Sequence, residues 1–102
     1  MSRVQPARRV AAEVLAAVRE NDAYANLLLP VRIREAGLAG PDAALATELV
    51  YGTFRMQGYY DRVIGLAARR SPTRIDAPVL DVLRLGAHQL LGMRVPAYRS
   101  EE

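Results

Sequence analysis

The chain has 102 residues, a size that fits one small domain and is too short for a complete dinucleotide-binding or barrel enzyme. It contains no cysteine and one histidine, which excludes a disulfide framework, a thiolate zinc site, a cysteine nucleophile and a cluster of histidines. Its 14 basic residues are all arginine and exceed the 11 acidic residues, so the net charge is +3. An apolar fraction of 51% excludes disorder. The sequence shows neither a signal peptide nor a membrane-spanning run, and a reducing cytoplasm is the expected compartment.

Alanine and leucine dominate the chain and no strand periodicity occurs, so an all-α fold of about five helices is predicted. Proline and glycine set the limits of these helices, which are predicted over residues 6–20, 23–36, 40–56, 58–70 and 76–93. Pro6 suits a first helical position, and Asn21 and Asp22 supply N-cap chemistry for the second helix. Pro30 is expected to kink or split that helix, and Gly37 is expected to follow it in a left-handed conformation.

The fifth predicted helix is apolar over most of its circumference. Asp81, Arg84 and His88 form its one narrow polar strip. A helix of this kind is typical of the centre of a bundle, where neighbours pack on several sides. Few residues follow it, so we expect further helices to complete the packing in a longer natural chain. The lone His88 is interpreted as a half-buried spacer rather than a catalytic or metal-binding residue.

Four segments carry a family resemblance, and their order and spacing hold over nearly the whole chain. Residues 7–11 (ARRVA) and 23–30 (AYANLLLP) resemble the start of a NusB-like domain. Residues 48–55 (ELVYGTFR) are similar to the family segment ELVYGTLR, and residues 85–96 (LGAHQLLGMRVP) are similar to its LGxYQLLxMxxVP segment. The chain most resembles the N-terminal NusB-like domain of bacterial rRNA cytosine-5 methyltransferases, the RsmB or Sun group.

The resemblance implies a NusB-like helical bundle in which about two further helices follow Pro96. Residues 1–102 are therefore interpreted as a truncated NusB-like RNA-binding domain, the N-terminal part of a larger methyltransferase. The implied reaction moves a methyl group from S-adenosylmethionine to a cytosine C5 of small-subunit rRNA and needs a cysteine thiolate. Because this chain has no cysteine and no glycine-rich cofactor loop, we expect it to be non-catalytic. S-adenosylmethionine is expected in the C-terminal methyltransferase domain, which would be a partner together with rRNA.

Two groups of arginines are candidate RNA contacts, because guanidinium groups bind phosphate bidentately. The members of the two groups are Arg3, Arg8, Arg9 and Arg19 near the N-terminus, and Arg69, Arg70 and Arg74 around a Ser-Pro turn. Free-standing NusB uses an arginine-rich helix start on RNA, and Arg8 and Arg9 lie at the matching place. The alternative for the first group is a solvated helix face in which Arg9 pairs with Glu13. The alternative for the second group is that its cations complement a helix dipole.

Three functions remain open from the sequence. The favoured one is an RNA-binding domain that positions small-subunit rRNA for the methyltransferase. The second is a NusB-type transcription antitermination factor that binds leader RNA together with a ribosomal protein. The third is an interaction scaffold that packs on the catalytic domain without contacting RNA. We also expect that the apolar side of the fourth and fifth helices, if uncovered, pairs with a second copy of the chain.

Overall fold

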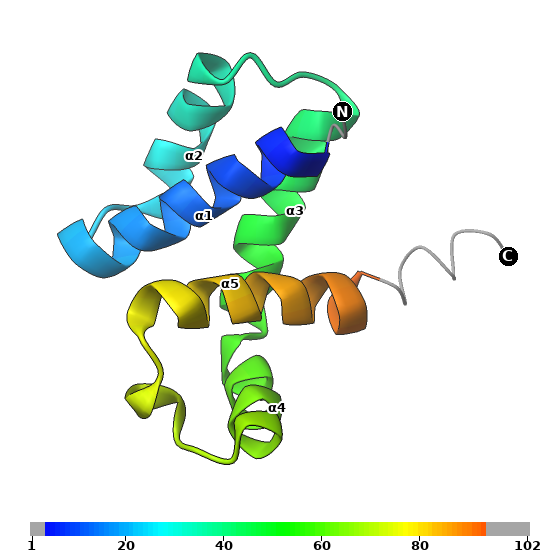
Figure 1. Cartoon of the computed structure of the whole chain (residues 1–102). Coiled ribbons are helices and arrows are strands. Elements are labelled where there is room, and N and C mark those ends of the chain that lie inside the picture. The colour runs from blue at the N-terminus through cyan, green and yellow to red at the C-terminus, as the bar shows by residue number, and fades with distance from the viewer. Residues whose placement is uncertain (1–3, 94–102) are drawn as a thin grey trace, which may run out of the picture. The chain divides into compact units, whose positions relative to one another are not determined.

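The computed structural model describes residues 4–93, with side chains from Pro6 onward, and it divides the chain into two compact units, Met1–Tyr51 and Gly52–Glu102. The described residues form helices and no strand, so the predicted all-α fold is confirmed (Figure 1). The five α-helices are α1 (Val4–Asn21), α2 (Ala25–Glu35), α3 (Pro41–Arg55), α4 (Gln57–Ala68) and α5 (Ala77–Ala87). A 3-10 turn, η1 (Pro72–Arg74), precedes α5, and a π-helical turn, η2 (His88–Gly92), follows it.

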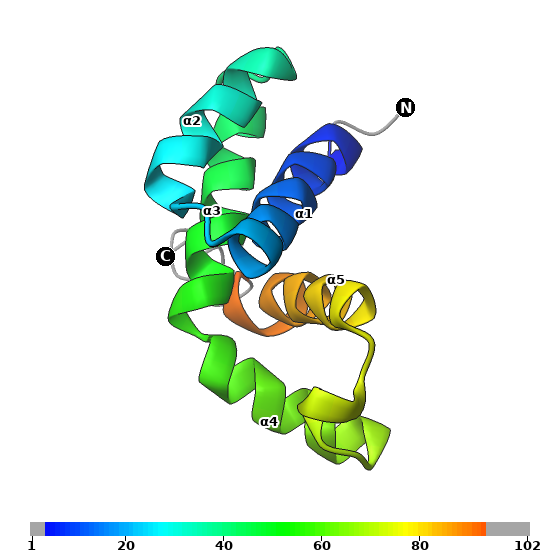
Figure 2. The same ribbon diagram turned by 90° about the vertical axis from the view of Figure 1, so that its left-hand side faces the viewer.

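Helix α1 supplies the largest share of the buried side chains in the first unit. These residues recur with the spacing of one helix face and are Ala7, Val10, Ala11, Val14 and Leu15, each at most 4% exposed. The chain then turns at Asp22, which has a positive φ of 55°, and returns as α2, which packs against α1 (Figure 2). Leu29 is the buried residue of α2. Amphipathic spacing therefore both forms α1 and directs its arginine-bearing side away from the core.

The expectations for α2 are met only in part. Pro30 lies inside a helix that is unbroken from Ala25 to Glu35, so it does not split the helix. Proline removes only one intrahelical hydrogen bond at this position, and the packing of Leu29 provides a compensating contribution. The N-cap residue is Tyr24, with no side-chain cap hydrogen bond, rather than Asn21 or Asp22. The left-handed conformation predicted at Gly37 is confirmed, with φ of 71°.

The second unit is built on a small apolar cluster between α4 and α5. Tyr60 and Ile64 of α4 and Leu80 of α5 are buried together, and Ile75 and Ala87 pack against them. The link between the helices includes η1, which begins after Ser71, whose hydroxyl accepts a hydrogen bond from the amide of Thr73 at 3.3 Å. This capping bond fixes the turn that brings α5 back along α4.

The polar strip of α5 faces inward, which the sequence did not indicate. Asp81 is 5% exposed and His88 is 1% exposed. Arg84 makes two hydrogen bonds to the carboxylate of Asp61 on α4, of 2.7 Å and 2.9 Å, and lies 3.9 Å from Asp81. Tyr60 Oη and His88 Nδ1 share a buried hydrogen bond of 2.6 Å. The strip is thus an internal polar contact with α4, and His88 is fully rather than half buried.

The fifth predicted helix also ends differently. It changes from α to π geometry at His88, and the amide of Met93 donates to the carbonyl of His88 at 2.9 Å. Gly92 closes this turn against Tyr60 and His88, and a side chain at Gly92 would collide with both. A π turn inserts one residue into the helix, which rotates the following residues relative to a regular α-helix. The backbone of Gly92 is thereby placed directly over the Tyr60–His88 hydrogen bond.

Candidate nucleic-acid interface

Arg8 and Arg9 are both exposed on α1, where Arg9 lies opposite the buried stripe and Arg8 lies at its edge. Neither side chain forms an ion pair with any residue that the structure describes. Arginine side chains without a carboxylate partner keep all of their donors for an external anion. The Arg9–Glu13 pair that would have explained this face structurally is absent between residues 4 and 93. The arginine pair Arg8 and Arg9 is therefore chemically suited to bind phosphate.

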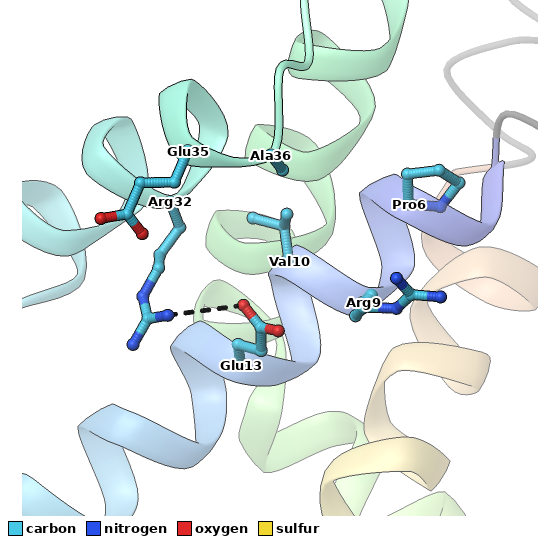
Figure 3. Close-up of a pocket in the computed structure, with 7 residues that line it drawn as sticks. All are labelled: Pro6, Arg9, Val10, Glu13, Arg32, Glu35 and Ala36. Atoms are coloured by element: carbon cyan, nitrogen blue, oxygen red, sulfur yellow. Dashed lines mark ion pairs between the residues drawn. The ribbon is translucent and has the colours of Figure 1, made fainter.

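The side chain of Arg9 also lines a groove between α1 and α2. This α1–α2 groove has a volume of about 400 Å³, and its lining residues are Pro6, Arg9, Val10 and Glu13 of α1 and Arg32, Glu35 and Ala36 of α2 (Figure 3). The α1 residues follow the i, i+3, i+4, i+7 spacing of one helix face. The groove is thus a direct consequence of packing α2 along α1.

The carboxylate of Glu13 pairs with Arg32 across this groove. The distance between Arg32 Nη1 and Glu13 Oε1 is 3.7 Å, and the two side chains are 38% and 46% exposed. In Figure 3, Arg32 extends from α2 toward Glu13, while the guanidinium of Arg9 points away from both, on the side of Pro6. Arg32 is not among the arginines that the sequence indicates as RNA contacts. Its position opposite α1 depends on how two helices pack, which periodicity within one helix does not reveal.

The other members of the first arginine group do not join this site. Arg3 lies outside the described residues. Arg19 is eleven residues from Arg8, about 16 Å along the helix axis at 1.5 Å per residue. Its guanidinium lies 3.4 Å from the carboxylate of Glu20. Arg8 and Arg19 therefore cannot hold the same phosphate, although they lie on the same side of α1.

The second arginine group is arranged around the end of α4. The helix ends at Ala68, and Arg69 is its C-cap residue, with a left-handed φ of 60°. Arg70 follows it, and Arg74 ends η1. All three are exposed, and none forms an ion pair within the part of the chain that the structure describes. Both interpretations of this group, phosphate binding and neutralisation of the α4 dipole, fit this placement.

Helices α4 and α5 and the η2 turn carry exposed apolar side chains in the described structure. The most exposed are Leu66 (81%), Leu90 (67%), Val82 (62%) and Tyr59 (52%). An open groove of about 690 Å³ on α4 is lined by Tyr59, Val63 and Leu66 with Gly58 and Arg62. Since large apolar patches are uncommon on monomers, pairing with a second copy stays a prediction. Light scattering should show a mass that rises with concentration, and Val82→Glu should keep the mass at that of one chain. A constant monomer mass for the unmodified protein would contradict it.

Within residues 4–93, no helix combines the length and the hydropathy that a membrane span requires.

Comparisons with known proteins agree on one family. The family model described as the NusB family matches residues 5–100. The chain is 57% identical over 95 residues to a protein named as a methyltransferase in Mycobacterium tuberculosis, in both the CDC 1551 / Oshkosh and the H37Rv strains. It is 34% identical over 83 residues to a Bacillus subtilis protein named as ribosomal RNA small subunit methyltransferase B.

These matches cover 93% and 81% of this chain, but the chain spans only 21% and 18% of the length of those relatives. No solved structure matches the chain significantly. The helices described above agree with the family match, which extends over nearly all of the sequence. The protein is therefore a member of the NusB family.

Proposed function

We propose that this chain is the RNA-binding domain of an rRNA methyltransferase and that it contributes no catalytic group. The observation that carries the proposal is the exposed arginine pair Arg8 and Arg9, which forms no ion pair within the described residues and of which Arg9 lines the α1–α2 groove. Family membership supports it, and so do the names of relatives as methyltransferases, one of them of small-subunit rRNA. Those names favour the methyltransferase context over the antitermination alternative.

Methyl transfer itself would belong to a part of such an enzyme outside this chain. The sequence has no cysteine to attack a cytosine ring. The described residues contain no strand followed by a glycine-rich loop and a helix, so they do not fit S-adenosylmethionine bound in that way. We also propose that S-adenosylmethionine binds to a C-terminal methyltransferase domain outside this chain. The role left for this chain is to hold rRNA in place.

The double variant Arg8→Ala/Arg9→Ala should bind an rRNA hairpin with a single-stranded loop at least about tenfold more weakly at low salt. The physical reason is the loss of two charge-assisted phosphate contacts. Fluorescence anisotropy at increasing salt measures both the affinity and the slope of log K against log salt. The slope should become shallower by about 1.4, because each single-strand phosphate contact contributes about 0.7.

The matched control is Arg34→Ala/Arg62→Ala, which removes the same charge from two exposed arginines outside both candidate groups. It should retain most of the affinity. Equal weakening by the two double variants would mean that only net charge matters and would reject Arg8 and Arg9 as a binding site. Absence of measurable RNA binding by the unmodified chain would reject the proposed function itself.

A further inference from the structure

We propose that Arg32 of α2 is a second RNA-binding residue, which holds the same single strand as Arg9 across the α1–α2 groove. We further propose that Glu13 holds Arg32 in the unbound protein and is displaced by an RNA phosphate. The inference rests on the proposed RNA-binding function. It extends the site from one helix to two, and it assigns a role to the one ion pair that spans the groove in the described structure.

The shape of the α1–α2 groove places arginines from two helices around one volume. Arg9 and Arg32 belong to different helices, and both line the same volume of about 400 Å³ (Figure 3). Val10, which is 3% exposed, supplies an apolar wall between the charged side chains. A volume of this size lies within the range of small-ligand sites, and a nucleotide unit needs both apolar and charged walls. The groove can therefore hold a segment of an RNA strand with cations on both of its sides.

The ion pair between Arg32 and Glu13 is weak. Its 3.7 Å separation is longer than a charge-assisted hydrogen bond, whereas Arg84 and Asp61 in the same chain meet at 2.7 Å and 2.9 Å. Both side chains are well exposed, and exposed pairs of this kind contribute little stability. A phosphodiester can offer Arg32 two acceptors that match the guanidinium donors. Displacement of Glu13 by phosphate therefore costs the protein little stability.

The mixed charge of the groove lining favours single-stranded RNA over a duplex. Two arginines and two glutamates line the groove, so its formal charge is zero. A duplex would present mainly phosphates to Glu13 and Glu35, which would repel them. An unpaired base instead presents amino groups, which carboxylates accept as hydrogen-bond donors, while its phosphates contact the arginines. The mixed lining thus favours a single strand and predicts modest affinity.

The experiment compares Arg32→Gln with Arg34→Gln, because both residues lie on α2 and only Arg32 lines the groove. Binding of a fluorescein-labelled single-stranded RNA of mixed sequence is followed by anisotropy at increasing salt. Arg32→Gln should weaken binding about fivefold and make the salt slope shallower by about 0.7, as expected for one lost phosphate contact. Arg34→Gln should change both values little. A duplex of the same sequence should compete poorly.

Two further variants distinguish a direct contact between Arg32 and RNA from an indirect effect. In the indirect case, loss of Arg32 would only leave the Glu13 carboxylate without its cationic partner, so that it repels RNA. Glu13→Gln should strengthen binding about twofold, because it releases Arg32. The double variant Glu13→Gln/Arg32→Gln should bind more weakly than Glu13→Gln alone by at least the fivefold factor. Binding of the double variant equal to that of Glu13→Gln would overturn the inference, since Arg32 would then act only by neutralising Glu13.

The inference and the proposed function fail differently. Equal effects of Arg32→Gln and Arg34→Gln, with Arg8→Ala/Arg9→Ala still weakening binding, would overturn the role of Arg32 and leave the proposed function intact. Failure of the unmodified chain to bind RNA would overturn both. Thermal melting followed by circular dichroism checks that each variant is folded, and these half-exposed positions should tolerate glutamine.

Discussion

Replacement of Arg84 by alanine should lower the free energy of unfolding by about 2–3 kcal/mol, the largest effect that we expect from a single substitution. The value lies between the median for exposed ion pairs, at most about 1 kcal/mol, and the cost of breaking a buried pair, about 3–5 kcal/mol. The side chains of Arg84 and Asp61 are 16% and 24% exposed, so the pair belongs between these limits. Urea denaturation followed by circular dichroism measures the change.

The large loss of stability is expected because two carboxylates lose their cationic partner when Arg84 is replaced. Its guanidinium makes two short hydrogen bonds to Asp61 and lies 3.9 Å from the buried carboxylate of Asp81. Alanine would remove the positive charge between two carboxylates that stay in place. Desolvated charges that lose a partner cost more than the pair itself contributes to stability.

Two control variants test this explanation. Arg84→Lys keeps the charge but cannot make the same two-pronged contact, so we expect roughly half of the loss. Arg62→Ala removes an exposed arginine of α4 and should change stability by no more than about 0.5 kcal/mol. If Arg84→Ala were as mild as Arg62→Ala, the contact between α4 and α5 would not depend on this ion pair.

Replacement of Gly92 by alanine should destabilise the protein by about 2 kcal/mol and lower its melting temperature by about 10 °C. A Cβ atom at this position would overlap Tyr60 Oη and His88 Nδ1. These two atoms already share a hydrogen bond of 2.6 Å, and their residues are 0% and 1% exposed, so neither ring can move aside at low cost. The added methyl group must displace the π turn or break the hydrogen bond. Differential scanning calorimetry measures the shift.

Gly86→Ala is the matched control, because a Cβ atom there meets no other atom within 4 Å. This glycine lies inside α5, where alanine is favoured by about 0.5–1 kcal/mol over glycine. The same chemical change six residues apart should therefore raise stability at one position and lower it at the other. A stabilising effect at Gly92 would show that the π turn does not bring its backbone against Tyr60 and His88.

The sequence predicted the positions of the helices better than it predicted which residues of other helices they contact. The spacing of apolar residues three and four apart from Ala7 to Leu15 specified both the existence of α1 and its buried face. Gly37 predicted the left-handed residue after α2 because few other residues adopt a positive φ. Of the two outcomes expected at Pro30, a kink or a split of the helix, the split is wrong, because α2 is unbroken from Ala25 to Glu35. The left-handed residue depends on the sterics of one position alone, whereas the outcome at Pro30 also depends on the packing of the whole helix.

In the candidate site, too, some residues could be found from the sequence and others only from the packing of the helices. Arg8 and Arg9 could be selected from the sequence, because their place on α1 and the family resemblance are both local features. Arg32 could not, because its role depends on which residue of α1 it faces. The Glu13 carboxylate had two possible arginine partners, and only the packing of α2 decided between them.

By itself, the sequence determined that the chain is helical, that it lacks a thiolate nucleophile and that it belongs to the NusB family. Only the tertiary structure decided that the polar strip of α5 faces α4 and that Arg32 shares a groove with Arg9. The physical reason is that composition and periodicity depend on neighbours along one helix. The burial of a charged or polar side chain depends on a partner from another helix, such as Asp61 for Arg84 and Tyr60 for His88.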